Sequence, residues 1–371
     1  MQGSEPVDKS QSKQSNIDLT TPLFGRFCMV VIGIDIGKDV FYAHLRAAEG
    51  SPPFKPCALP NVENTVSGCA QLLQWAASHG STPSDLLVVM EATGVYWETC
   101  ALTLHQAGCQ VSVINPGQIK LFARSVLRRG KTDTMDAEII ARYGVVMRPS
   151  LWEPPLASIE ELKVLVRERE TLQHTLTQER NRLHALQHKA RSITTVVALV
   201  QQRINLLQEQ IDALQRAMHA LVARNPVLSE PLNLLLTVPG YGFVTAVSVL
   251  AETQGFHGLH SSRQLFAYAG IAPAPHQSGA MNGPAHISKT GNAHLRRTAY
   301  LAAVGAMKCK GPIGQYYRQL RARGKPTKVA LVALGRKLLG IGFAVVASGM
   351  PYDEAFESKR KTAEQAQQVP C

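Results

Sequence analysis

The hydrophobic pattern of the N-terminal part of the chain predicts short strands alternating with helices. Residues 30–36 form a continuous apolar run rich in β-branched residues, which is typical of a strand buried on both faces. After Gly37 apolar and polar positions alternate, which predicts a hairpin partner strand. Two further apolar runs predict strands at 85–91 and 110–115, so we expect an α/β sheet with helices packed on it. The helices expected around these strands lie at 66–78, about 97–107 and within 118–143.

The middle of the chain has the pattern of a coiled coil. Residues 157–225 contain neither proline nor glycine, and the apolar positions of the second half alternate four and three apart. These positions are Ile193, Val197, Val200, Ile204, Leu207, Ile211, Leu214, Met218 and Leu221. The first half follows the same period but places Arg169 and Glu179 in the seam. Residues 189–195 are the expected turn of a hairpin, and pairing within one chain or across two subunits both fit this pattern.

The C-terminal part of the chain is predicted to be mostly helical. Residues 234–250 read as a helix, a Pro-Gly-Tyr-Gly turn and a second helix, which resembles the helix-hairpin-helix element that holds a phosphate on backbone amides. The apolar run 329–348 has the length of a membrane span, but Arg336 and Lys337 lie at its middle. We interpret this run as a core helix and expect no membrane association.

Together these patterns divide the chain into five predicted parts. They are a disordered extension at 1–28, an α/β domain at 29–152, coiled-coil helices at 153–226, a basic helical domain at 227–350 and a flexible tail at 351–371.

The distribution of charge favours a polyanionic partner. The net charge is +12, and every charged residue between Thr253 and Tyr352 is lysine or arginine. Such a region suits the phosphate backbone of a nucleic acid. Seven cysteines without a Cys-x-x-Cys pair predict neither a disulfide framework nor a zinc site, and no secretory leader is evident, so we expect a cytoplasmic protein.

Four acids are candidates for chemistry. Asp35 lies inside an apolar strand, where a carboxylate is costly unless it is paired, hydrogen-bonded or bound to a metal. Glu91 ends another apolar strand, and Asp133 and Asp136 share one face of a predicted helix. In a ribonuclease-H-like fold such acids hold two divalent ions roughly 3.5–4 Å apart to cleave a phosphodiester, and Mg²⁺, or alternatively Mn²⁺, is the expected cofactor.

Each acid except Asp35 also has a plain structural interpretation. Glu91 could be a solvated strand end, and Asp133 and Asp136 could be the N-cap and N3 acids of a helix that begins near Thr134. Two other functions are also open at this point. An actin-like kinase or ATPase begins with a similar strand but needs a second Asp-x-Gly loop, which the chain lacks, and a non-catalytic RNA- or DNA-binding scaffold would use the coiled coil and the basic region.

A set of short motifs resembles a known family. In the first half these are Gly-Ile-Asp-Ile-Gly-Lys at 33–38, Met-Glu-Ala-Thr-Gly-Val-Tyr at 90–96, Asn-Pro-Gly-Gln-Ile-Lys at 115–120 and Lys-Thr-Asp-Thr-Met-Asp-Ala at 131–137. In the second half they are Thr-Val-Pro-Gly-Tyr-Gly at 237–242, Tyr-Ala-Gly-Ile-Ala-Pro at 268–273, Gln-Ser-Gly at 277–279 and Ile-Ser-Lys-Thr-Gly-Asn at 287–292. In this order they resemble the DEDD insertion-sequence transposases, whose catalytic domain is similar to the Holliday-junction resolvase RuvC.

The resemblance implies a fold, a reaction and a set of residues. It implies an α/β ribonuclease-H/RuvC-like domain, followed by an α-helical coiled-coil segment and a mostly α-helical C-terminal domain. The DEDD residues carry over onto Asp35, Glu91, Asp133 and Asp136. Family members also use a serine nucleophile in the second domain, which by its motif is Ser278 here; from the residues alone, Ser288 is its rival. One departure is that residues 280–285 are neutral where relatives tend to carry basic residues.

The resemblance also implies partners. A structured guide RNA, the bridge RNA, would select donor and target double-stranded DNA by base pairing, and the recombinase would act as a homodimer or homotetramer. The basic residues that we expect at the nucleic acid are Lys120, Arg124, Arg128, Arg129, Lys131, Lys289, Arg296 and Arg297.

Overall fold

A computed structural model describes residues 30–48, 55–127, 132–191, 193–278 and 281–355. The chain divides into two compact units, one up to Pro154 and one from Pro155 onward. The predicted extension at 1–28 and residues 356–371 of the predicted tail lie outside the described residues.

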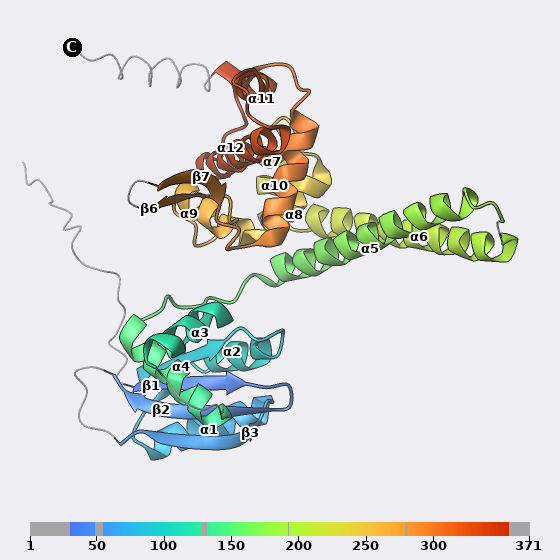
Figure 1. The fold of residues 1–371 in the computed structure, drawn as a ribbon. Coiled ribbons are helices and arrows are strands. Elements are labelled where there is room, and N and C mark those ends of the chain that lie inside the picture. Colours follow the sequence, from blue (N-terminus) through green and yellow to red (C-terminus); the bar gives the residue numbers. More distant parts are fainter. Residues whose placement is uncertain (1–29, 49–54, 128–131, 192, 279–280, 356–371) are drawn as a thin grey trace, which may run out of the picture. The chain divides into compact units, whose positions relative to one another are not determined.

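The first unit is built on a mixed five-stranded sheet in the order β3-β2-β1-β4-β5 (Figure 1). Its strands are β1 (Val30–Ile36), β2 (Val40–Ala47), β3 (Cys57–Glu63), β4 (Leu86–Glu91) and β5 (Gln110–Ile114). β1 lies at the centre, antiparallel to β2 and parallel to β4, as the buried run and the following alternation predicted. β5 is parallel to β4. β3, which the sequence patterns did not predict, pairs antiparallel with β2. This mixed sheet with its helices agrees with the predicted α/β domain.

Helices cover both faces of this sheet. On one face, alternate residues of β1 and β4 pack with α1 (Val66–Ser78) and α2 (Trp97–Gln106) in one hydrophobic cluster. On the other face, the intervening residues pack with α3 (Pro116–Ser125) and α4 (Asp133–Met147). The unit is therefore three-layered, and each residue of the central strands belongs to a defined face because side chains alternate along a strand.

The close packing of α4 on β1 depends on Gly33. A Cβ atom at this position would lie 2.1 Å from the amide nitrogen of Ala141 and 2.3 Å from the carbonyl oxygen of Ala137, both on α4. Gly144 does the same from the helix side, where a Cβ would come within 2.8 Å of Val31 and Val89. Because neither glycine has a side chain, the backbone of β1 lies directly against α4. This close packing brings the start of α4 to the carboxyl end of β1.

The second unit is helical apart from one two-stranded hairpin. Its helices are α5 (Ala157–Gln187), α6 (Thr194–Ala223), α7 (Pro226–Leu236), α8 (Phe243–Glu252), α9 (Ser262–Tyr268), α10 (Ala293–Ala306), α11 (Pro312–Ala322) and α12 (Thr327–Ser348). Their buried apolar residues form one continuous core, to which the near ends of α5 and α6 also belong.

The two long helices α5 and α6 pack against each other within the chain (Figure 1). Beyond the main core, the predicted seam residues Val200, Ile204 and Ile211 are buried against Leu176 of α5. Glu179, the acid predicted in the seam, pairs with Arg203 across the hairpin at 3.1 Å. Of the two pairings left open by the sequence, the structure has the one within a chain; a regular coiled-coil geometry stays a prediction.

The Pro-Gly-Tyr-Gly turn joins α7 and α8 as predicted. Its Tyr241 is buried, and the hydroxyl donates to the backbone carbonyl of Leu338 on α12 at 3.3 Å. Within the described residues, α12 has the length and apolar composition of a membrane span, and 44% of its most apolar window is buried. Its residues Leu331, Leu334 and Leu338 belong to the core of the unit, which agrees with a core helix.

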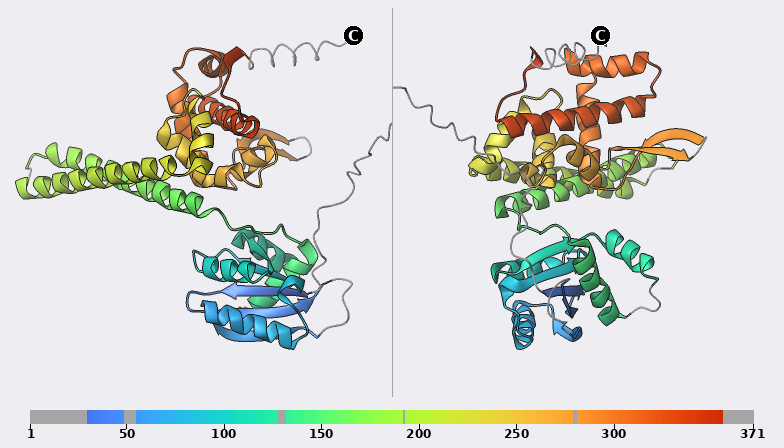
Figure 2. Two further views of the ribbon diagram at one scale, coloured as in Figure 1. Left: turned by 180° about the vertical axis from the view of Figure 1, so that it is seen from behind. Right: turned by 90° about the vertical axis from the view of Figure 1, so that its left-hand side faces the viewer.

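The Pro- and Gly-rich stretch after α9 forms strands, which the mostly helical prediction for this part of the chain did not include. It is an antiparallel hairpin of β6 (Pro273–Ser278) and β7 (Met281–Ile287), which extends from the helices of the unit (Figure 2). The register shifts between Ala274 and His276, so the prolines and glycines fit an irregular pair of strands.

We expect Gly33→Ala to lower the free energy of unfolding of the first unit by about 1–3 kcal/mol, because the added methyl group collides with the α4 backbone. Urea unfolding followed by tryptophan fluorescence measures this unit selectively, since Trp75, Trp97 and Trp152 all belong to it.

Gly117→Ala in the first turn of α3 is the matched control. A Cβ there would meet only a flexible side-chain oxygen, that of Asn115, at 3.1 Å, so the change should stay within about 0.5 kcal/mol. Equal stability losses in the two variants would contradict the role of Gly33.

Candidate active site

Three of the four predicted acids form a carboxylate group in the first unit. Asp35, Asp133 and Asp136 each place one carboxylate oxygen so that these oxygens lie within 4.8 Å of one another. Asp35 and Asp136 are half-buried, and Asp133 is exposed. Residues separated by about a hundred positions in the sequence therefore share one site.

The local structure explains how each acid reaches this group. Asp35 is on the α4-facing side of β1, together with Val31 and Gly33, because it is an even number of residues from both. On α4, the N-cap is Thr132, whose hydroxyl accepts from the amide of Met135 at 3.3 Å. Asp133 is thus the first residue of the helix. The structural interpretation, in which Asp133 is the N-cap, is therefore wrong. Asp136 follows one turn later on the same face.

Glu91 lies at the edge of this arrangement. The parallel register pairs Ile34 of β1 with Met90 of β4, so the following residues, Asp35 and Glu91, are neighbours on the α4-facing side of the sheet. The side chain of Glu91 is not within the 4.8 Å group, and one of its oxygens accepts from the hydroxyl of Thr93 at 3.5 Å. The backbone therefore places the fourth acid beside the group, and its carboxylate lies outside the 4.8 Å set.

The donor set fits a hard divalent cation. Three carboxylates at this spacing repel one another, and a cation between them removes that repulsion while accepting the oxygen ligands that Mg²⁺ and Mn²⁺ prefer. The N-terminus of α4 adds a partial positive charge next to Asp133, which offsets part of the repulsion.

The predicted basic residues have different surroundings. Lys120 and Arg124 are exposed on α3 in the first unit. Lys289 is exposed in the second unit, in a left-handed backbone conformation with φ 57°. Arg128, Arg129 and Lys131 lie outside the described residues.

The two arginines of α10 make protein contacts. The Arg296 guanidinium donates to the carbonyls of Ala269 and Lys289 at 3.1 and 3.2 Å. Arg297 forms an ion pair with Glu170 of α5, which His294 also contacts at 2.6 Å. The structure therefore gives both arginines a packing role that their position in the acid-free stretch did not indicate.

The two candidate serines lie at opposite ends of the hairpin. Ser278 is the last residue of β6, where its backbone is in register with Met281. Ser288 directly follows β7, is exposed, and donates its amide to the carbonyl of Ala272 at 3.0 Å. Ser278 therefore lies toward the far end of the hairpin and Ser288 at its base.

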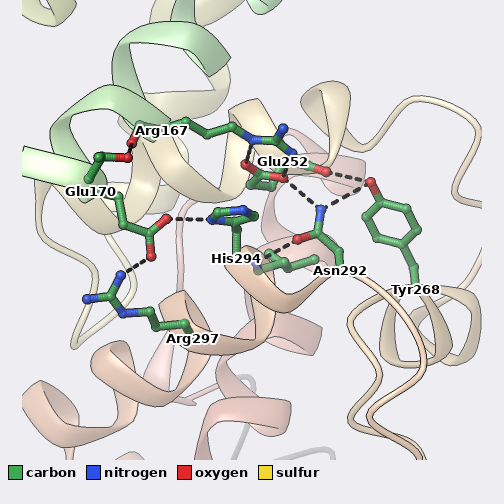
Figure 3. Close-up of polar contacts among 9 residues, drawn as sticks. Arg167, Glu170, Glu252, Tyr268, Asn292, His294 and Arg297 are labelled. Atoms are coloured by element: carbon green, nitrogen blue, oxygen red, sulfur yellow. Dashed lines mark hydrogen bonds and ion pairs between the residues drawn. The ribbon is translucent and has the colours of Figure 1, made fainter. Parts of the chain in front are cut away.

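Sequence reasoning missed a buried acid in the second unit. Glu252 ends α8, is 1% exposed, and accepts hydrogen bonds from Arg167 and Asn292 (Figure 3). The signal that could have found it is the one that singled out Asp35, because Glu252 closes the apolar run Val-Ser-Val-Leu-Ala and is the last acid before the acid-free stretch.

Family models match both halves of the chain. Residues 32–191 match the model of the DEDD transposases of the IS110 type, and residues 232–318 match the model of the transposase IS116/IS110/IS902 family. The first match contains all four predicted acids, and the second contains both candidate serines.

Whole-length relatives agree with these matches. The pilin gene-inverting protein of Moraxella bovis is 32% identical over 325 residues, which are 87% of this chain and 97% of that protein. The transposase for insertion sequence element IS1328 of Yersinia enterocolitica is 24% identical and covers 88% of this chain and 99% of its own. Among solved structures, Thermus thermophilus RuvC has 20% identity, covers 32% of this chain and 98% of its own, and has a TM-score of 0.23.

We expect Asp136→Asn to weaken Mn²⁺ binding by at least about tenfold, since even outer partners of metal ligands contribute about 10–100-fold to affinity. Titration calorimetry with Mn²⁺ measures the affinity of parent and variant.

Asp39→Asn is the control, because Asp39 is an exposed acid in the turn after β1 and lies outside the group. Mn²⁺ affinity that is the same in the Asp136→Asn variant as in the parent would rule out this carboxylate as a ligand.

Proposed function

The chain belongs to the IS110 family of DEDD transposases and is a DNA recombinase, and we propose that it breaks and rejoins DNA with a metal-binding carboxylate group and a serine nucleophile. The observation that carries this proposal is the convergence of Asp35, Asp133 and Asp136 within 4.8 Å at the end of the central strand. If Asp35 only filled a position in the strand, and Asp133 and Asp136 only stabilised the start of the helix, their carboxylates would have no reason to lie together.

The carboxylates are the proposed metal ligands. Asp35, Asp133 and Asp136 hold a divalent ion, with Mg²⁺ the expected ion and Mn²⁺ a substitute, and Glu91 joins when its side chain turns toward the group. A bound ion of this kind would polarise a phosphodiester and stabilise the charge that develops on its oxygens. The half-buried position of Asp35 and Asp136 supports this assignment, since a partly dry site strengthens electrostatic interactions.

Ser278 is the proposed nucleophile. Its hydroxyl oxygen forms a bond to phosphorus while the bond from phosphorus to one sugar oxygen breaks, and the proton lost by the serine ends on the released sugar hydroxyl. The energy of the phosphodiester is kept in the serine–DNA ester, so a sugar hydroxyl of another strand can attack in the reverse sense and restore the serine. The family match over 232–318 and the place of Ser278 on a hairpin extending from the helices support this role.

The proposed partners are donor and target double-stranded DNA and a structured guide RNA. The acid-free stretch from Thr253 to Tyr352 supports contact with phosphate backbones of either kind. Guidance by base pairing would leave the protein to bind backbone without reading bases. Handling several strands in one reaction suits a homodimer or homotetramer, and we propose that the protein acts in the cytoplasm.

Ser278→Ala should lower the yield of a covalent protein–DNA adduct by at least about 10³-fold, because the attacking oxygen is lost. The full-length protein with its co-purified nucleic acid is incubated with Mg²⁺ and end-labelled DNA of the element junction, and adducts are resolved on a denaturing gel. Asp35→Asn should lose the adduct as well while retaining DNA binding.

Ser288→Ala is the matched control, and its adduct yield should stay near that of the parent. Loss of the adduct in this variant with retention in Ser278→Ala would transfer the nucleophile to Ser288. Retention in both variants would contradict the serine mechanism.

RNA that co-purifies with the protein should contain one defined species encoded beside the gene, because a guide must be specific. Sequencing of the bound RNA tests this expectation. A mixture of host RNAs without such a species would reject guidance and leave only electrostatic binding.

A further inference from the structure

The segment that carries Ser278 leaves and re-enters the helical core at the same point. It begins after Tyr268, the last residue of α9, and ends at Asn292, the N-cap of α10. The amide of Asn292 donates to the carbonyl of Tyr268 at 2.6 Å, and the amide of Lys289 donates to that of Gly270 at 3.0 Å. The two ends of the segment are thus joined directly at the base of the hairpin.

Two glycines make this crossing tight. Gly270 and Gly291 have φ of 66° and 134°, and a Cβ on Gly291 would lie 2.3 Å from the carbonyl oxygen of Tyr268. A Cβ on Gly270 would lie 2.8 Å from the carbonyl oxygen of Thr290. The two backbones therefore touch where no other residue type fits.

Arg296 holds the same crossing from α10. Its guanidinium donates to a carbonyl on each side of the segment, that of Ala269 before the hairpin and that of Lys289 after it. A single side chain therefore spans both ends, and charge-assisted hydrogen bonds of this type are stronger than neutral ones.

Glu252 connects both ends of the segment to the helical core (Figure 3). Its carboxylate accepts from Arg167 Nε and Nη2 at 2.9 and 3.1 Å and from Asn292 Nδ2 at 2.7 Å. Its backbone carbonyl accepts from the hydroxyl of Tyr268 at 2.9 Å. One residue of α8 is therefore bonded to the residue before the segment, to the residue after it, and to α5.

The chemistry of Glu252 makes this connection stiff. Desolvation by burial acts to raise the pKa of Glu252, but the hydrogen bonds from Arg167 and Asn292 and the charge of Arg167 outweigh it, so the pKa lies below its usual value. Asn292 is held twice, because its Oδ1 also accepts from the amide of Leu295 at 3.0 Å as the cap of α10. The buried carboxylate of Glu252 has three hydrogen-bond donors. Any movement of its side chain would break at least one of these bonds without replacing it by water.

We propose that Glu252 is a positioning residue, which together with Arg167 and Asn292 fixes the base of the hairpin and thereby the position of Ser278 on β6. This inference rests on the proposed serine mechanism. A two-stranded hairpin has little stability of its own, so its direction is set where it joins the core. A nucleophile must reach its phosphate within a fraction of an ångström, and a displacement of about 1 Å can cost about 10²-fold in rate.

The first test measures the hairpin without DNA. A nitroxide attached through a ketone-bearing amino acid at position 274, an exposed residue of β6, reports motion by its spectral line shape and leaves the cysteines untouched. Glu252→Gln should convert the spectrum from slow to fast motion, because an amide nitrogen replaces one accepting oxygen. With the nitrogen at the Oε1 position the bond from Arg167 Nε is lost, and with the nitrogen at the Oε2 position the bonds from Arg167 Nη2 and Asn292 are lost. A label at Gln319 on α11 should not change, which separates release of the hairpin from loss of the fold.

The second test measures the reaction. Glu252→Gln should lower the rate of adduct formation by about 10–100-fold, with affinity for DNA and for Mn²⁺ unchanged within about twofold. Glu170→Gln is the matched control. Glu170 lies on α5 near Arg167 and contacts His294 and Arg297, but it contacts neither Tyr268 nor Asn292. If Glu252→Gln does not fold, Tyr268→Phe removes one bond of the same clamp and should give a smaller change in both readouts.

The two tests fail in different ways. An immobile label at position 274 in folded Glu252→Gln would overturn the positioning role, whatever the adduct assay shows. A released label together with a normal rate of adduct formation would overturn it as well. A released label with an adduct that survives Ser278→Ala would instead reject the serine mechanism and leave the clamp as a structural feature.

Discussion

The candidate active site depends on the contact between Gly33 of β1 and the backbone of α4. Asp35 is carried by the strand and Asp133 and Asp136 by the helix, so the distance between strand and helix sets the distance between the acids. A side chain at position 33 would separate the two elements. The same face of the sheet places the backbone of Glu91 beside the group, because β4 runs parallel to β1 in register. A close backbone approach thus brings three distant acids together as one candidate cation site.

Asp35 and Glu252, two acids at the ends of apolar runs, meet the cost of burial in different ways. Asp35 lies next to two further carboxylates, so its charge is balanced when a cation is bound. Glu252 has an arginine and an asparagine as donors, so its charge is balanced within the protein and needs no ligand. The first arrangement is typical of a site that takes up an ion, and the second is typical of a structural joint. The same sequence signal, an acid in an apolar run, precedes both.

Much of the fold was predictable because local patterns are strong there. β1, β4 and β5 are largely apolar runs, β2 alternates between apolar and polar positions, and α1 and the pair α5 and α6 have clear helical periodicity. β3 was missed because it is a largely exposed edge strand that contains Pro60 and has Asn61 at φ 59°, so it lacks both an apolar run and alternation. The β6–β7 hairpin was missed because its prolines and glycines have the composition of a loop, and only its pairing makes it a strand pair.

The sequence by itself determined which residue types are present and which local elements they form: four acids at strand and helix ends, a serine in a Gly-rich motif, and a basic stretch without acids. The tertiary structure decided which of them meet. It brought three acids within 4.8 Å of one another without Glu91, and it gave Arg296 and Arg297 protein partners that their sequence position did not indicate. The reason is physical, since propensity and periodicity act over a few residues, whereas the distance between two side chains far apart in the chain is set by packing, and here by a glycine that allows a helix to touch a strand.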